Sequence, residues 1–414
     1  MNKLYKFFIA FFLLPSTIFS QLEKVYMPPP DYIGSAVCSV NDYPYLHPIV
    51  KLGEKLFISF DDLYGDEKTY YYRIRRYDEN WQPSGLMPIE YVDGYDQDMI
   101  QNEENSTATV QTYTHYAFEI PNENTRITKS GNYLIEILNE DEEPVFNFPV
   151  IVYENAVPVS VSVHYPSDIS LSNSHQFVTF TLHTEHFPIA DINSDLTAIV
   201  LKNENLFDVR RFDRPTFISQ GRGLRYYYPD KALFQGGGEF HSFETRNLRG
   251  YNRGLDSLKL NDFYDAYVMP FWPAKSYEDF RDIDGSFVIK ALQAGNPDTE
   301  GDYMRVHFRV PAGEIEEGKK IYVIGRFNNW QTNEQSLLKR NGDFYTVTAI
   351  LKQGYYDYYF VGRKPDGRLD WAALQPSFSE TENRYTVLVY YHPQGARFTR
   401  VIGMGQAVSK PLKQ

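Results

Sequence analysis

The stretch Gly131-Asn132-Tyr133-Leu134-Ile135-Glu136-Ile137-Leu138 opens on a turn signal and continues as a run rich in isoleucine, leucine and tyrosine. Residues 148–153 follow as a near-continuous β-branched and aromatic run. Such residues fit the pleated, half-buried surface of a strand. Short strands at roughly ten-residue spacing, with turn residues between them, predict β-sandwiches. Further runs of the same kind lie on both sides, at residues 56–60, 70–76, 159–164, 177–182, 197–201, 264–269, 304–308, 321–324, 344–350, 355–361 and 385–390.

The composition indicates the same fold class. Aromatic residues make up 16% of the chain, which favours strands. The 24 prolines and 26 glycines are spread along the sequence, as expected for many turns and few long helices. Outside the N-terminal segment, no stretch sustains the helical period of about 3.6 residues. We therefore predict an all-β protein of three consecutive immunoglobulin-like β-sandwich modules.

Two changes in composition suggest module boundaries. Residues 154–158 end one strand-rich block and lead into the next, and residues 273–285 are rich in charge and turn formers. We predict modules of ordinary domain size, without an internal repeat. The predicted division is a signal peptide at 1–20, an N-terminal sandwich at 21–155, a second at 156–275, a third at 276–402 and a tail at 403–414.

The first residues are typical of an export signal. Lys3 and Lys6 form a basic start, residues 7–14 are apolar, Pro15 breaks the run, and Ser20 offers a small residue for cleavage. The apolar run is shorter than the about 20 residues that a membrane-spanning helix needs. A short buried N-terminal helix is the alternative interpretation. Because no later segment is long and apolar enough to span a membrane, we expect an exported, soluble mature chain.

The single cysteine, Cys38, excludes a disulfide bond within the chain. The fold must therefore be held together by burial of its core and not by covalent crosslinks. We expect Cys38 to be a buried structural residue.

The chain is acidic, with a formal net charge of −13. Loss of the two lysines in the predicted signal peptide lowers this charge to −15. Nucleic-acid binding requires a basic surface, so this class of partner is disfavoured. Adsorption to anionic lipid is disfavoured for the same reason. Solubility alone is a sufficient explanation of the charge.

The sequence contains no familiar catalytic pattern: it lacks a phosphate-binding Gly-Lys-Ser loop, a nucleophile elbow and zinc-ligand spacing. Asp61, Asp62 and Asp66 could bind calcium, but no ordered array of oxygen ligands follows, and a solvated acidic turn is the alternative. Gly236-Gly237-Gly238 lacks the strand–turn–helix setting of a phosphate cradle, so we interpret it as backbone relief at a turn or bulge. We expect no enzymatic activity, catalytic residue, cofactor or metal.

The third module carries a more specific pattern. The stretch Gly325-Arg326-Phe327-Asn328-Asn329-Trp330 follows a strand and is succeeded by the aromatic run 354–361 and an Asp-Gly turn at 366–367. This order resembles the early-set immunoglobulin-like modules that accompany glycogen-processing enzymes and kinases. In glucan-binding members a tryptophan stacks on a sugar ring, and Trp330 occupies that place.

The sugar-binding set implied by this resemblance is incomplete. Tyr359 stands where a lysine is usual, and Trp371 is displaced from the position of a second tryptophan, where Leu369 is nearest. Asn383 matches a polar contact of the set. Two interpretations stay open for Trp330: a sugar platform, or a large aromatic residue of the core.

The first module, taken whole, resembles the type IX secretion system plug proteins of Bacteroidota, a family first catalogued as an uncharacterised domain. The chain departs from the family at Arg76-Tyr77, where a His-Cys pair is common. The resemblance extends from about residue 32 to residue 403. The segments that carry it in order are 48–54, 59–63, 70–74, 81–84, 91–94, 113–116, 121–124, 130–133, 237–240, 351–356, 380–383 and 387–391.

This resemblance implies a non-enzymatic periplasmic plug. Its partner would be the wide outer-membrane β-barrel of the type IX translocon, whose aqueous lumen must be closed when no cargo is exported. We take Trp81 and Tyr91 as candidate partner contacts because such residues are enriched at interface anchors; packing inside the first sandwich is the alternative. A carbohydrate-binding protein that uses Trp330 is the alternative function.

Overall fold

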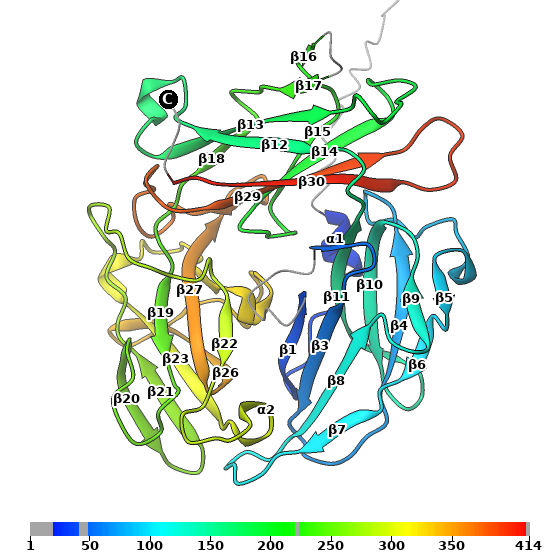
Figure 1. The fold of residues 1–414 in the computed structure, drawn as a ribbon. Helices are drawn as coiled ribbons and strands as arrows, with labels where there is room; N and C mark the ends of the chain where they lie inside the picture. The colour runs from blue at the N-terminus through cyan, green and yellow to red at the C-terminus, as the bar shows by residue number, and fades with distance from the viewer. Residues whose placement is uncertain (1–19, 41–48, 220–222, 411–414) are drawn as a thin grey trace, which may run out of the picture.

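The computed structural model describes residues 20–40, 49–219 and 223–410. Its strands pair into three units of two sheets each (Figure 1). The prediction of an all-β fold is confirmed. The predicted signal peptide lies outside the described residues except for Ser20, which begins the short helix α1 (Ser20–Val25).

The first unit is built around β10 (Gly131–Leu138), the strand with which the fold prediction began. Every residue of β10 is buried, because one face packs in the unit's own core and the other against the second unit. This double burial explains the nearly continuous apolar sequence. One sheet has the order β1 (Ile33–Val40), β3 (Leu56–Asp62), β8 (Thr114–Ile120), β7 (Asn102–Asn105); the other has β2 (Ile49–Lys51), β11 (Pro144–Tyr153), β10, β4 (Tyr71–Tyr77), β6 (Gln97–Met99); β5 (Val92–Gly94) and β9 (Thr125–Ile127) form a ribbon.

The second unit combines strands that are far apart in the sequence. Its inner sheet pairs β14 with β29 over seven residue positions, from Leu196↔Tyr391 to Lys202↔Tyr385. This sheet has the order β15 (Val209–Phe212), β14 (Leu196–Lys202), β29 (Arg384–Tyr391), β30 (Arg400–Val408); the other has β12 (Val159–His164), β13 (His175–His183), β17 (Gly223–Tyr226), β16 (Phe217–Ile218), with β18 (Leu233–Gln235) also on β13.

The third unit has one sheet centred on β27 (Gly354–Arg363) and a second sheet in which the long strands β23 and β26 pair. Phenylalanine and tyrosine side chains fill the space between its sheets. One sheet has β19 (His241–Glu244), β27 and β22 (Phe287–Ile289), with β24 (Tyr322–Ile324) and β28 (Leu369–Asp370) also on β27; the other has β20 (Leu255–Leu260), β21 (Tyr264–Val268), β23 (Tyr303–Pro311), β26 (Phe344–Lys352), β25 (Lys339–Asn341).

The strand pairing corrects the predicted module boundaries. Residues 255–268, placed in the second module at 156–275, pair with β23 and belong to the third unit. Residues 384–402, placed in the third module at 276–402, complete the second unit, and β30 extends into the predicted tail at 403–414. Composition along the chain reveals where strands occur, but not which distant strands pair.

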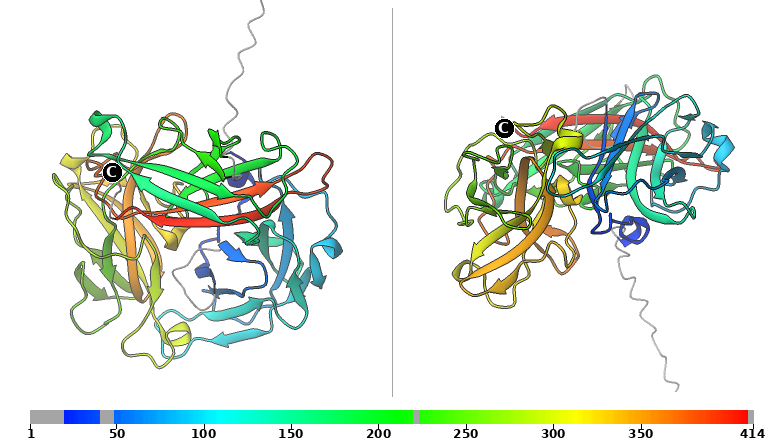
Figure 2. Two further views of the ribbon diagram at one scale, coloured as in Figure 1. Left: turned by 45° about the horizontal axis from the view of Figure 1, so that its top comes forward. Right: turned by 90° about the horizontal axis from the view of Figure 1, so that it is seen from below.

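The three units meet pairwise (Figure 1). The second unit lies across the top of the other two, with the first at lower right and the third at lower left; Figure 2 (left) shows the red strands β29 and β30 crossing above both. The first and second units share an apolar cluster that includes Leu134 and Ile151 from one and Leu388 and Val401 from the other. The backbone amide of Glu154 also donates to the carbonyl of Val401 over 2.7 Å.

Helices are few and short in the described part of the chain. Besides α1, these are α2 (Pro297–Glu300) and four single turns of 3₁₀ helix, at Pro88–Glu90, Ile169–Leu171, Ala312–Glu314 and Arg326–Asn328. Among the helices of the described residues, none has the length and apolar character needed to cross a membrane.

Candidate functional site

The two candidate contacts in the first unit are both buried. Trp81 lies at the boundary with the second unit, where its ring is 6.2 Å from that of Tyr77, and its backbone has a φ of 57°. Tyr91 packs in the first core at 5.9 Å from the ring of Tyr133. Neither side chain presents a surface to a partner in this structure; their proposed contact role stays a prediction, and their burial favours the packing alternative.

Trp330 is also buried, with 2% of its surface exposed. It packs at 5.8 Å from the ring of Phe240, within a buried aromatic cluster of the third unit. Gly285, with a φ of 77°, makes room for it, since a Cβ on this glycine would lie 2.4 Å from the Trp330 ring. The interpretation of Trp330 as a core residue is therefore the one that the structure favours.

The rest of the sugar-binding set is occupied by the protein itself. The ammonium of Lys202, on β14 of the second unit, lies 4.2 Å from the centre of the Trp371 ring. The side-chain amide of Asn383 donates to the carbonyl of Gly236 over 2.9 Å and to Gln176 over 3.1 Å. We call this boundary the second–third seam. Along it, Lys202 of the second unit covers the ring of Trp371.

The glycine-rich turn at 236–238 makes this coverage possible. A Cβ on Gly236 would lie 1.9 Å from the carbonyl oxygen of Phe378, so only glycine fits there. The amide of Gly238 donates to the Tyr359 hydroxyl over 3.0 Å, and Lys202 donates to the Gly236 carbonyl over 2.7 Å. The interpretation of this turn as backbone relief is confirmed. It lets the chain that leaves the second unit at Gly236 approach the backbone at Phe378 closely.

The first and third units meet through a buried ion pair. The ammonium of Lys352, on β26, lies 2.6 Å from a carboxylate oxygen of Asp61, on β3, and both side chains are almost fully buried. The Tyr303 hydroxyl lies 2.6 Å from the same carboxylate, and His115 lies 2.6 Å from its other oxygen. Burial lowers the pKa of Lys352, while the charge of Asp61 opposes that shift. We call this boundary the first–third seam.

This seam overturns one sequence-based interpretation. Asp61 and Asp62 were expected in a solvated acidic turn, yet both are fully buried. Lys68 lies 2.8 Å from Asp62 and 3.0 Å from Asp66, so lysines neutralise all three carboxylates. Within the described residues, no group of three or more His, Cys, Asp or Glu side chains is arranged to hold a metal ion. The sequence could not reveal this arrangement, because Lys352 is distant along the chain.

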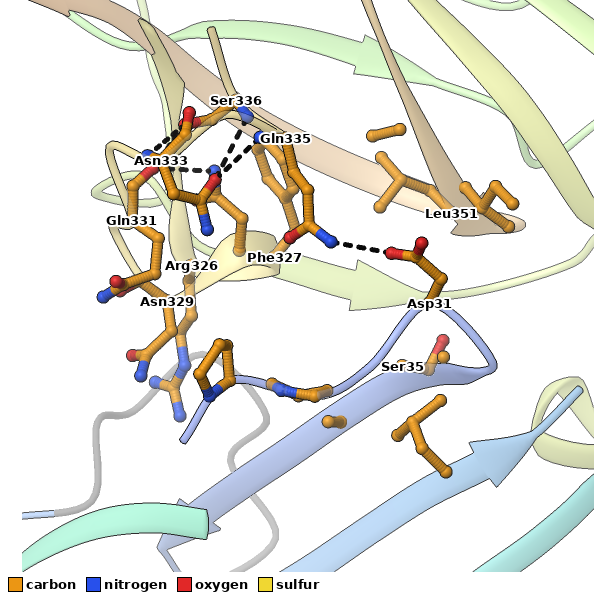
Figure 3. A pocket seen from close by; sticks show the side chains of 18 of the residues that line it. Asp31, Ser35, Arg326, Phe327, Asn329, Gln331, Asn333, Gln335, Ser336 and Leu351 are labelled. Carbon is orange, nitrogen blue, oxygen red and sulfur yellow. Dashed lines mark hydrogen bonds between the residues drawn. The ribbon is translucent and has the colours of Figure 1, made fainter. Parts of the chain in front are cut away.

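A cavity of about 540 Å³ opens beside the ion pair, between the first and third units (Figure 3). One wall is β1 with the preceding prolines, and the other is the polar loop 329–336 with β26. The side-chain amide of Gln335 donates to Asp31 over 2.7 Å and joins the two walls. Within the loop, the Ser336 hydroxyl donates to the carbonyl of Gln331 over 2.7 Å, which holds the loop in place.

Arg326 lies in the cavity wall and crosses the same seam. Its Nη2 donates to the carbonyl of Cys38 on β1, so that the edge of the first unit is tied to the third. Burial raises the pKa of the Cys38 thiol to about 12. Cys38 is therefore a buried, protonated thiol, in agreement with its expected structural role.

Sequence reasoning missed the one exposed tryptophan. Trp272 is 65% exposed, and Met269 nearby is 50% exposed. Both follow the end of β21, in a segment where Pro270 and Pro273 interrupt strand pairing. Prolines on both sides of an aromatic residue were the signal that could have indicated an exposed position.

Comparison with known families matches two parts of the chain. Residues 33–154 match the first domain of the type 9 secretion system plug protein, and residues 315–393 match the glycogen recognition site of AMP-activated protein kinase. Both resemblances predicted from the sequence are thereby confirmed. The first match indicates a plug-like protein associated with the type IX secretion system, near the outer membrane. Neither matched family is an enzyme family.

A solved structure shares the entire fold. The crystal structure of a hypothetical protein from Parabacteroides merdae ATCC 43184 is 27% identical, with a TM-score of 0.88 over 92% of this chain and 98% of that chain. A biofilm-associated protein, BSP domain, has a TM-score of 0.16 at 7% identity over 92% of this chain and 60% of that chain, too low to bear on the fold. Among the curated proteins, none matches this chain.

The glycogen-recognition match spans the second–third seam. Its range, 315–393, includes β24 to β28 of the third unit but also β29, which pairs with β14 in the second unit. The strand after Asn383 is therefore incorporated into a neighbouring sheet, and this places Asn383 among second-unit residues. The part of the chain that matches the glycogen recognition site therefore contributes strands to both the third and the second unit.

Proposed function

We propose that this protein is a non-enzymatic periplasmic plug of the type IX secretion system. It docks on the periplasmic opening of the outer-membrane translocon barrel and seals it when no cargo is being exported. The observation that carries this proposal is the match of residues 33–154 to the first domain of the plug family. The partner barrel and the periplasmic location are parts of the proposal.

The way the units are joined supports a rigid sealing body. A wide barrel encloses an aqueous lumen, and closing it requires bulk that does not deform. The first and second units share an apolar cluster, Lys202 of the second unit lies over the Trp371 ring of the third, and the first and third share the Asp61–Lys352 pair. Relative motion of any two units would expose apolar surface or separate a buried ion pair, both of which are costly.

Trp272 is the residue that we propose as a contact with the barrel. Tryptophan is enriched among the residues that dominate binding energy at interfaces. Trp81, Trp330 and Trp371 are buried, whereas Trp272 is largely exposed and has the exposed Met269 close by in the sequence.

Affinity capture from outer membranes tests the proposal. The tagged mature protein is mixed with detergent-solubilised outer membranes of its host, and co-eluting proteins are identified by mass spectrometry. We expect recovery of a large barrel protein in near-equal amounts. Failure to recover it from cells that express the translocon well would contradict the plug function.

Carbohydrate binding is the second candidate, because residues 315–393 match a glycogen recognition site. The burial of Trp330, Trp371 and Asn383 disfavours it, since a sugar cannot stack on a covered ring. Retention of the intact protein on immobilised glucan, displaced by free oligosaccharide, would favour this candidate over the plug.

A further inference from the structure

The cavity at the first–third seam has the size and lining of a small-molecule site. Ligand pockets are typically about 300–1,000 Å³ and mostly apolar, with a few polar groups. The cavity, at about 540 Å³, has Ile33 and Phe148 on one wall and Val323, Phe327 and Leu351 on the other. An apolar chain in this space would gain the free energy of leaving water.

Arg326 gives the cavity a buried positive charge with an unused hydrogen-bond donor. Its Nη1 is shielded from solvent and has no hydrogen-bond acceptor in the described part of the chain. Glu204 of the second unit is the carboxylate whose charge acts on Arg326 and partly offsets it. Burial lowers the pKa of Arg326 to about 10, so the guanidinium is still charged at neutral pH.

The other charged groups of the cavity already have partners. Arg305 lies 2.9 Å from Asp265 and 3.3 Å from Asp262. Asp31 accepts a hydrogen bond from Gln335. A buried donor without an acceptor is costly, and an anion that binds Arg326 supplies the missing hydrogen bond together with a direct countercharge. Arg326 is therefore the charged group of the cavity wall that has a donor available to a ligand.

We propose that this cavity binds a small amphiphilic molecule whose single anionic group, a carboxylate or a phosphate, pairs with Arg326 while its apolar chain lies between β1 and β26. A fatty acid and a phosphate-bearing lipid fragment are the two sources of this chemistry. The proposal rests on the cavity and on Arg326, and it is independent of the proposed plug function.

Calorimetric titration of the whole protein with three probes tests this site. Decanoate carries a carboxylate, decyl phosphate a phosphate, and decanol the same chain without charge. We expect one or both anionic probes to bind at least about tenfold more tightly than decanol, because a hydrogen bond to a charged group contributes about 1.5–3 kcal/mol. The tighter of the two anionic probes then identifies the source.

Two variants and one control locate the binding. Arg326→Gln keeps a donor for the Cys38 carbonyl but removes the charge, and we expect it to bind the anionic probes about tenfold more weakly while decanol is unaffected. Ala349→Trp on β26 fills the cavity and is expected to abolish binding of all three probes. Arg305→Gln is the matched control, because it removes a cavity arginine whose charge is already compensated; we expect it to bind as the wild type does.

The proposal is overturned if decanol binds the wild type as tightly as the anionic probes do, if no probe binds, or if Ala349→Trp binds normally. Unchanged binding by a folded Arg326→Gln also contradicts it. Circular dichroism and thermal melting establish that each variant is folded. If Arg326→Gln does not fold, the comparison of the three probes on the wild type and on Ala349→Trp decides the question.

Discussion

The second–third and first–third seams join the same unit to its neighbours in two different ways. At the second–third seam, Lys202 of the second unit covers the Trp371 ring at the edge of the third unit's aromatic cluster, and the glycine turn at 236–238 brings the backbones into contact. At the first–third seam, the buried pair Asp61–Lys352 stands beside a cavity of about 540 Å³. The second–third seam is closely packed, whereas the first–third seam is joined by a few polar contacts around a cavity.

This difference indicates which junction can respond to a ligand. A close-packed seam has no volume for another molecule, and opening it would leave the buried polar groups of Lys202 and Asn383 without their partners. A seam with a cavity and a buried charge can gain or lose an occupant without being opened. We therefore expect the second and third units to behave as one body, and ligand effects to arise at the first–third seam.

The largest effect is expected from Trp330→Ala. Removal of a fully packed tryptophan should lower the free energy of unfolding by about 3–5 kcal/mol, through lost burial and the cavity that remains. Chemical denaturation followed by fluorescence measures it. A loss below about 1 kcal/mol would mean that Trp330 is not packed in the third unit's core, and it would reopen the sugar-platform interpretation.

Lys352→Met should have the next largest effect. Removing one partner of a buried ion pair leaves an uncompensated charge and typically costs about 3–5 kcal/mol. We expect about 3 kcal/mol here, because Asp61 keeps the Tyr303 hydroxyl and His115 as neighbours. Lys55→Met, which breaks the exposed pair with Glu119, is the control and should cost less than about 1 kcal/mol. Equal losses of unfolding free energy for the two variants would contradict a stabilising role of the buried Asp61–Lys352 pair.

A pH titration of stability sharpens the comparison at the second–third seam. Burial lowers the pKa of Lys202 from its usual 10.5 to about 7. Between these values the unfolded chain binds more protons than the folded protein, so the stability should rise with pH, by at most about 1.4 kcal/mol per pH unit. Denaturation between pH 7 and 9 measures this slope. Lys202→Met should reduce it, and an unchanged slope in this variant would show that other groups titrate.

The smallest effect on stability is expected from Trp272→Ala, which lies outside both seams. An exposed side chain should change the free energy of unfolding by less than about 0.5 kcal/mol. The same variant should reduce the recovery of the barrel protein in affinity capture, because tryptophan anchors dominate interfaces. Tyr251→Ala, which removes another exposed aromatic residue of the third unit, is the control. Equal recovery for wild type and Trp272→Ala would remove Trp272 as a contact.

Much of the local structure could be predicted from the sequence. The run at 131–138 became β10, and the aromatic run at 354–361 lies within β27. The two family resemblances also followed from local order and spacing. The site residues were less predictable. Trp81 and Trp330 were predicted as candidate contacts because they are large aromatic residues, yet both are buried, whereas Trp272 is exposed and the sequence did not indicate it. Residue type does not reveal whether a side chain is exposed, because burial depends on which distant segments of the chain pack against it.

The sequence by itself determined the fold class, the positions of most strands and the two families that the chain resembles. These properties depend on residues close together in the chain, through alternation, turn chemistry and motif spacing. Only the tertiary structure decided that β29 and β30 complete the second unit, that Lys352 neutralises Asp61, and that Lys202 covers the ring of Trp371. The reason is that each of these contacts joins segments far apart along the chain, and neither partner alone carries a signal for the other.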